Sequence, residues 1–111
     1  MYNKTLGDIG EKMAGFVLER EGYYILERNY RWGNHGEIDI VAVKDGIWRI
    51  VEVKTRTGIE FGLPCEAVDN LKRKRMEMCF RHFLYNRGLE YSEFRIEIVE
   101  IYVNHIKGGI I

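Results

Sequence analysis

Two apolar segments joined by Asp45-Gly46 are the feature that most constrains the fold of this chain. The segments GEIDIVAV (36–43) and IWRIVEVKTR (47–56) are rich in β-branched residues. Asp-Gly between two such runs is the strongest short-range signal for a β-hairpin with a two-residue turn. Such a turn fixes the register, because residues equally distant from it face one another. The sequence therefore predicts that Asp39 faces Glu52 and that Glu37 faces Lys54.

Both faces of this predicted hairpin are apolar over most of its length. The residues expected on one face are Val41, Val43, Trp48 and Ile50, and those on the other are Ile38, Ile40, Ala42, Val51 and Val53. Strands that are apolar on both faces are covered on both sides. Two facing carboxylates beside such a core are unfavourable, because like charges repel and burial adds a desolvation penalty. A cation bound between Asp39 and Glu52 would remove this conflict.

Two interpretations fit the charged end of the hairpin. In the first, Glu37 and Lys54 form a cross-strand ion pair, while Asp39 and Glu52 lie at the solvated end of the sheet. In the second, Asp39 and Glu52 hold a divalent metal ion, and Lys54 lies beside it. The facing pair, the Glu-x-Lys spacing and the buried character of both strands favour the second.

Phosphodiester hydrolysis is the chemistry that these residue types suit. The reaction needs charge stabilisation at the phosphate and an activated water molecule, and carboxylate-bound Mg²⁺ supplies both. The compact ammonium group of Lys54 could hold a phosphate oxygen or orient the attacking water. A metal-dependent hydrolytic site is therefore the functional prediction at this position.

The rest of the chain predicts two helices and further strands around the hairpin. Apolar periodicity predicts a helix over 5–21, a short strand over 23–28, a loop over 29–36, a loop over 58–64, a helix over 65–87, and one long strand or two short ones over 94–103. The order α, β, β, β, α, β indicates an α/β protein with a mixed sheet and a helix on each face. At 111 residues, 46% of them hydrophobic, the chain is expected to form one domain over 1–111.

Charge and composition narrow the function classes. Lys plus Arg and Asp plus Glu each number 17, so net charge gives no support for nucleic-acid binding, and any basic footprint must come from local clustering. No apolar run reaches signal-peptide length or the roughly 20 residues that span a bilayer, so a soluble cytoplasmic protein without membrane contact is expected. The scattered His residues and the pair Cys65 and Cys79 show no zinc-ligand spacing.

Two clusters could supply a nucleic-acid surface. One is the basic run from Lys72 to Arg75 in the second predicted helix, and the other combines Arg28, Asn29, Arg31 and Trp32. Each cluster suits phosphate contacts, but an ordinary solvated helix explains the first equally well, and an ordinary exposed turn explains the second somewhat better. The residues alone leave both alternatives open.

The segments GEIDIVAV and VEVKTR, preceded by a helix bearing Gly10-Glu11 and by GYYILERNYR, resemble the YraN family of small bacterial proteins. The likeness runs from about Gly10 through Phe83 and resumes over 95–101. That family is similar in turn to archaeal Holliday junction resolvases and to other members of the PD-(D/E)XK, or restriction-endonuclease-like, superfamily. Ile38 stands where the superfamily has proline, next to and not at the position that carries the chemistry.

The resemblance implies a restriction-endonuclease-like fold and a set of site residues. It implies Mg²⁺ or Mn²⁺ bound by Asp39 and Glu52 with the backbone carbonyl of Val53 as a further ligand, a catalytic role for Lys54, and a supporting carboxylate from Glu11. Lys72 matches a lysine of the family pattern, and it is expected, together with Arg28 and Arg31, to contact nucleic acid.

Two functions follow as hypotheses. The first is a Mg²⁺-dependent endonuclease acting on branched or otherwise structured DNA, and the second is a noncatalytic nucleic-acid-binding or interaction module that retains the nuclease fold. Junction substrates have two-fold symmetry, which makes a homodimer a further expectation.

Overall fold

The computed structural model describes residues 4–57, 69–90 and 92–103, which form two helices and four strands. The elements are α1 (Lys4–Arg20), β1 (Tyr24–Arg31), β2 (Glu37–Lys44), β3 (Ile47–Thr57), α2 (Asn70–Asn86) and β4 (Phe94–Val103). The strands form one sheet in the order β1-β2-β3-β4. The β1–β2 and β2–β3 pairs are antiparallel and the β3–β4 pair is parallel, which confirms the predicted α/β class, element order and mixed sheet.

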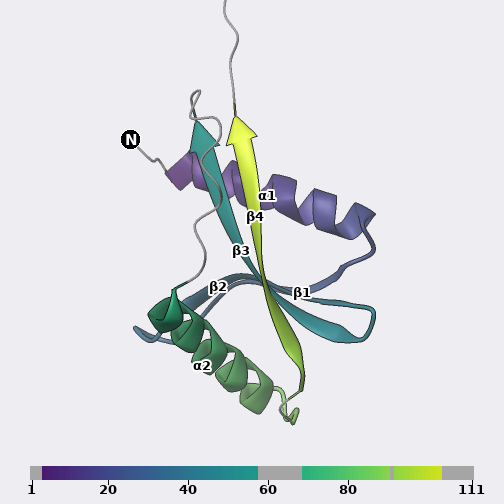
Figure 1. Ribbon diagram of the computed structural model, residues 1–111, viewed down its shortest axis with the longest axis vertical. Helices are drawn as coiled ribbons and strands as arrows, with labels where there is room; N and C mark the ends of the chain where they lie inside the picture. Colours follow the sequence, from purple (N-terminus) through teal and green to yellow (C-terminus); the bar gives the residue numbers. More distant parts are fainter. Residues whose placement is uncertain (1–3, 58–68, 91, 104–111) are drawn as a thin grey trace, which may run out of the picture.

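The two helices cover opposite faces of the sheet (Figure 1), as predicted. The cluster under α2 contains the largest buried side chains, among them Val41, Ile50, Phe80 and Phe83. The cluster under α1 is smaller and contains Ala14, Leu18, Ile40, Ala42 and Val51. Because β2 and β3 contribute to both clusters, they form the buried centre of the fold and fix the orientation of the residues at their ends.

The hairpin between β2 and β3 has the predicted turn and register. Asp45 and Gly46 both have positive φ, 53° and 73°, as a two-residue hairpin turn of the type I′ kind requires. The paired residues run from Lys44 opposite Ile47 to Ile40 opposite Val51. The predicted register is therefore confirmed over this part of the hairpin.

Pairing between β2 and β3 ends just before the charged residues. Asp39 and Glu52 are not a ladder pair, and neither are Glu37 and Lys54, because β2 turns away from β3 beyond Ile40. The predicted cross-strand pairing is therefore wrong at this end of the hairpin. β3 continues to Thr57 with β4 as its ladder partner. The physical reason is that the Asp39 side chain, and not a β2 carbonyl, accepts the hydrogen bond from Val53 N–H, at 2.8 Å.

The alternation of side chains along β2 also breaks at Asp39. Ile38 was expected on the same face as Ile40, but Ile38 packs in the α2 cluster and Ile40 in the α1 cluster. Asn29, with φ 53°, lies on β1 between the partners of Ile38 and Ile40. A residue in this left-handed conformation interrupts the period of two. The prediction for Ile38 is therefore corrected, and Asp39 lies between two residues of β2 that pack on opposite faces of the sheet.

Two predicted boundaries are also corrected. The expected loop over 29–36 is wrong at its start, because β1 extends through Arg31. The helix predicted over 65–87 begins only at Asn70, because Asp69 is extended and caps the helix by accepting from Lys72 N–H at 2.7 Å. The predicted loop over 58–64 and residues 65–68 lie outside the described residues.

α1 lies close to the sheet because small residues face it. A Cβ atom at Gly10 would overlap the Thr55 side chain of β3, and one at Gly15 would overlap the Arg28 guanidinium group of β1. These contacts hold α1 at a fixed height over the end of β3 that follows Glu52. Within the described residues, neither helix is long and apolar enough to cross a bilayer.

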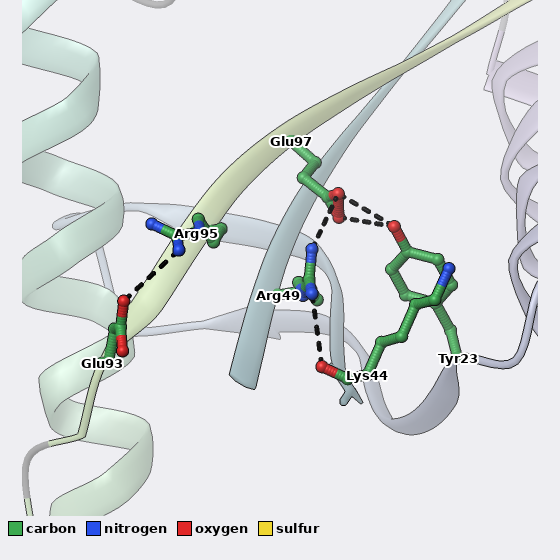
Figure 2. A network of polar contacts seen from close by, with 6 residues as sticks. All are labelled: Tyr23, Lys44, Arg49, Glu93, Arg95 and Glu97. Atoms are coloured by element: carbon green, nitrogen blue, oxygen red, sulfur yellow. Dashed lines mark hydrogen bonds and ion pairs between the residues drawn. The ribbon is translucent and has the colours of Figure 1, made fainter. Parts of the chain in front are cut away.

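A polar cluster on the α1 face closes the other end of β3 (Figure 2). Tyr23 Oη donates towards both carboxylate oxygens of Glu97, at 2.8 and 2.9 Å, and Arg49 Nη1 lies 3.6 Å from Glu97 Oε2. Arg49 also donates to the backbone carbonyl of Lys44 at 3.3 Å. Burial and the neighbouring Glu97 carboxylate raise the pKa of Tyr23 to about 12, so this phenol remains a donor at physiological pH.

Candidate metal centre

A pocket of about 470 Å³ opens where β2 separates from β3, beneath the first turn of α2. Its lining residues are Gly36, Glu37, Asp39, Glu52, Asp69, Leu71, Lys72, Arg75 and Met76. The break in the β2–β3 ladder forms one wall, and the capped start of α2 forms the opposite one. Asp39 and Glu52, which sequence reasoning singled out, thus reach the same pocket although they are not a ladder pair.

Asp39 is a perturbed carboxylate. Burial raises its pKa from 3.8 to about 6, the hydrogen bond from Val53 N–H opposes this, and the negative charges of Glu11, Glu37 and Glu52 raise it further. An acid with this pKa is partly protonated near neutrality. A positive ligand beside Asp39 would favour the charged form and remove the penalty.

Only one of the two carboxylate oxygens of Glu52 has a partner among the described residues. Its side chain is 15% exposed, and Oε1 forms an ion pair with Lys72 Nζ from α2. Its second oxygen, Oε2, is buried and has no hydrogen-bond partner in the described part of the chain. A buried carboxylate oxygen without a partner is unfavourable, and it marks a position where a donor or a cation would stabilise the protein.

Lys54 and Val53 follow Glu52 on β3. The regular pairing of β3 with β4, where Lys54 lies opposite Glu100, keeps alternating side chains on alternate faces. Lys54 is therefore on the same face as Glu52 and is half-buried. The Val53 side chain packs in the α1 cluster, and its backbone N–H is committed to Asp39.

Glu11 approaches the candidate site from the α1 side. Burial raises its pKa, a hydrogen bond with Asn29 opposes that shift, and the charges of Glu37 and Asp8 add to it. Its charge in turn raises the pKa of Asp39. Glu11 therefore belongs to the electrostatic environment of Asp39 without lining the pocket.

The structure separates the three predicted nucleic-acid contacts. Lys72 lies in the pocket on Glu52. Arg31 is 68% exposed, pairs with Glu37 at 3.0 Å, and lines a smaller neighbouring pocket of about 280 Å³. Arg28 packs over Gly15 of α1 and lies 3.6 Å from Glu19, so it is outside the lining of either pocket.

The fit of this site to a divalent metal can be judged from its donors. Among residues 4–57, 69–90 and 92–103, no group of three or more His, Cys, Asp or Glu side chains converges closely enough to hold a metal ion. Asp39 and Glu52 still offer hard carboxylate oxygens, of which Glu52 Oε2 lacks a partner. Mg²⁺ is commonly bound through one or two carboxylates, with water and phosphate oxygens completing its coordination. The donor set fits that kind of site.

Sequence reasoning missed Asp69 as a pocket residue, and it identified Arg75 only as part of the basic run in the second helix. Asp69 carries a readable signal, because Asp directly before a helical pattern is a favoured N-cap. Arg75 carries none beyond its place in the basic run. It reaches the pocket because its backbone approaches Gly36, where a Cβ would lie 3.3 Å from the Arg75 carbonyl oxygen.

Comparison with known proteins relates most of the chain to one family. Residues 10–101 match the model described as "Uncharacterised protein family UPF0102". A UPF0102 protein of Alkaliphilus metalliredigens is 41% identical over 105 residues, which cover 95% of this chain and 91% of the relative. The UPF0102 protein CD630_12710 of Clostridioides difficile strain 630 is 40% identical over 111 residues and 96% of each chain. UPF0102 protein TTE1452 of Caldanaerobacter subterraneus is 40% identical over 101 residues, covering 91% of this chain and 82% of the relative.

Proposed function

The chain belongs to the uncharacterised protein family UPF0102, for which YraN is another name, and from this premise we propose that it is a Mg²⁺-dependent endonuclease that hydrolyses DNA phosphodiester bonds. The proposed metal ligands are Asp39 and Glu52, with the Val53 carbonyl as a third. Mn²⁺ would serve in place of Mg²⁺. The substrate would be branched or otherwise structured DNA.

The observation that carries this proposal is the buried, partnerless Oε2 of Glu52 in a pocket shared with Asp39. A buried carboxylate oxygen without a partner lowers stability unless a ligand satisfies it. Here the β2–β3 ladder is broken, and one Asp39 oxygen is used to satisfy Val53 N–H. This arrangement fixes Asp39 beside Glu52 and leaves oxygen atoms for a cation.

The residues of the chain would divide the chemistry as follows. Mg²⁺ between the carboxylates would supply positive charge at the scissile phosphate and a more acidic water molecule. Lys54, on the same face of β3 as Glu52, would hold a phosphate oxygen or orient the water. Glu11 would act through its negative charge on Asp39. The surrounding apolar core would keep both acids in place and limit access of bulk water.

The restriction-endonuclease-like, PD-(D/E)XK, assignment is part of the same proposal. It is supported by a central hairpin whose acidic residues lie where β2 and β3 separate, by Glu52 and Lys54 at Glu-x-Lys spacing, and by a helix on each face of a mixed sheet. Fold likeness alone would not assign an activity. The proposed hydrolysis therefore depends on the site and not on the sheet.

A noncatalytic nucleic-acid-binding module is the alternative, and three observations favour it. Among the described residues no group of three or more His, Cys, Asp or Glu side chains converges closely enough to hold a metal ion, and Lys72 already neutralises Glu52. The net charge of zero fits modest nucleic-acid affinity. In this alternative the pocket is retained for binding, and hydrolysis is absent.

One assay separates the two functions. Wild-type protein, Asp39→Asn and Glu52→Gln are incubated with branched, single-stranded and linear duplex DNA in EDTA, Mg²⁺ or Mn²⁺, and folding of each variant is checked by circular dichroism. The proposal predicts cleavage by wild type only with metal, and a loss of at least about 10²-fold in each folded variant. Metal binding without cleavage of any of these substrates would favour the noncatalytic module.

A further inference from the structure

Lys72 links the candidate metal site to the predicted DNA surface. We propose that Lys72 is a resident counter-ion of Glu52, that a divalent metal displaces it, and that the displaced ammonium group then binds a DNA phosphate. This inference rests on the proposed metal-dependent nuclease function. It assigns to one side chain two successive partners and makes metal binding and DNA binding cooperative.

Lys72 and Glu52 are unequally buried. Lys72 Nζ pairs with Glu52 Oε1, but the Lys72 side chain is 45% exposed and that of Glu52 is 15% exposed. The Glu52 side chain is enclosed on β3, whereas the more exposed Lys72 side chain has room to rotate into water. A metal ion that binds Glu52 therefore replaces the lysine and leaves the carboxylate in position.

The start of α2 is fixed over the pocket by its cap. Asp69 Oδ1 accepts from the backbone N–H of Lys72 at 2.7 Å, which holds the first helical turn over the pocket. Displacement thus moves the flexible four-carbon side chain while its backbone stays at the pocket rim. The freed ammonium group would lie next to the metal. It could therefore contact a DNA phosphate that approaches the metal.

Acids outnumber cations in the described lining of the pocket. Its described lining contains four acids, namely Glu37, Asp39, Glu52 and Asp69, and two cations, Lys72 and Arg75. Without metal, Lys72 neutralises Glu52 and has no charge to spare for a polyanion. With metal, the acids are neutralised by the ion and Lys72 becomes available. Since coupling is reciprocal, DNA should then raise metal affinity as metal raises DNA affinity.

Metal affinity provides the first test, because it does not depend on cleavage. Mn²⁺ binding is measured by calorimetry at fixed ionic strength for wild type, Lys72→Met, Lys72→Arg and Lys74→Met, the last a matched change at an exposed position of the same helix. Loss of the competing cation should tighten Mn²⁺ binding by roughly five-fold in Lys72→Met, while Lys72→Arg and Lys74→Met remain near wild type. Equal affinities in wild type and Lys72→Met would overturn this inference alone. No Mn²⁺ binding by any of the four would overturn the proposed function as well.

DNA affinity provides the second test. Binding of a branched duplex is measured in EDTA and in Ca²⁺, with gel analysis confirming that the DNA stays intact. Lys72→Met should lose several-fold more affinity in Ca²⁺ than in EDTA, and the slope of log affinity against log salt should fall by about 1 only in Ca²⁺. Lys74→Met should lose the same amount in both. A Lys72→Met effect that is equal in EDTA and Ca²⁺ would overturn the proposed exchange of partners.

Discussion

Glu97 on β4 and Glu52 on β3 are both largely buried carboxylates beside a cation, yet their surroundings differ. Both oxygens of Glu97 accept from Tyr23 Oη, and Arg49 lies 3.6 Å away (Figure 2). Glu52 pairs with Lys72 through one oxygen only, and its other oxygen is buried without a partner in the described residues. The two side chains are 27% and 15% exposed, so burial does not explain the difference.

The comparison indicates how a structural polar cluster can be told from a ligand site. Tyr23, which precedes β1, and Arg49 on β3 both contact the Glu97 carboxylate, and the ring of Tyr23 is also covered by Lys44 and Arg49. Arg49 itself keeps one buried nitrogen, Nε, without a hydrogen-bond partner among the described residues. Beside Glu52, burial and then the negative charges of Glu11, Glu37 and Glu52 raise the pKa of Asp39. A carboxylate with partners on both oxygens stabilises the fold, whereas one with a buried oxygen that lacks a partner keeps binding capacity for a ligand.

The largest expected effect is on the rate of DNA cleavage, and it distinguishes Lys54, near Glu52, from Arg49, beside Glu97. Lys54→Met should reduce DNA cleavage by about 10² to 10³-fold with little change in melting temperature, because this lysine is assigned to phosphate or water. Arg49→Met should do the reverse, lowering stability by about 1 to 2 kcal/mol and leaving the rate per folded molecule near wild type, because it removes a buried partner of Glu97. Single-turnover cleavage and thermal unfolding of the same preparations measure both. If Arg49→Met lost as much rate as Lys54→Met, the functional division between the two regions would be wrong.

The next largest effect is stabilisation by metal. At a free Mg²⁺ or Mn²⁺ concentration 100 times Kd, wild type should gain about 2.7 kcal/mol, or about 10 °C in melting temperature. Glu97→Gln should show the same gain, since Glu97 does not line the pocket, whereas Asp39→Asn and Glu52→Gln should show little. Differential scanning calorimetry with and without metal measures the shifts. An undiminished gain in Asp39→Asn would remove Asp39 from the proposed ligand set.

The same two regions show what the sequence could predict. The hairpin was predictable because Asp45-Gly46 imposes a turn and the turn imposes a register. The end of pairing beyond Ile40 was not, since it depends on Asp39 accepting from a backbone N–H that pattern rules assign to a ladder bond. A side-chain oxygen that takes the place of a backbone carbonyl as hydrogen-bond acceptor does not change the pattern of apolar residues.

The partners of each carboxylate were beyond sequence reasoning for a different reason. Tyr23 and Glu97 are far apart in the chain and meet only because β4 adds in parallel beside β3. The contact of Lys72 with Glu52 depends on where α2 begins. The helix begins at Asn70, five residues later than predicted, because Asp69 caps it. The residues able to bind a ligand or take part in a reaction could be identified from the sequence. Which of them contact one another depended on the strand order and on one helix boundary.

A smaller effect on stability should distinguish the two glutamates in the absence of metal. Glu97→Gln should lower the free energy of unfolding by about 1 to 2 kcal/mol, because Arg49 would lose its buried counter-charge. Glu52→Gln should change it by less than about 0.5 kcal/mol, because the lost partner Lys72 is 45% exposed and one Glu52 oxygen had no partner to lose. Urea unfolding in EDTA compares the two variants. A larger loss in Glu52→Gln than in Glu97→Gln would show that Glu52 is a structural residue.

The smallest effect is a pH dependence whose sign metal should reverse. The pKa of Asp39 is about 6 in the folded protein against an ordinary value of 3.8, so from about pH 4 upwards the unfolded chain releases this proton before the folded chain does. Stability in EDTA should therefore fall as pH rises from about 4 to about 6, and then level off. Asn at this position can still accept from Val53 N–H but cannot ionise, so the melting temperature of Asp39→Asn relative to wild type should rise by a few degrees over that interval. With Mg²⁺ the order should reverse, because metal binds the ionised carboxylate and wild type gains stability as pH rises through about 6. If the melting temperatures of wild type and Asp39→Asn changed in parallel with pH in EDTA, Asp39 would not have the raised pKa. If they changed in parallel only when Mg²⁺ is present, Asp39 would not be a ligand of the metal.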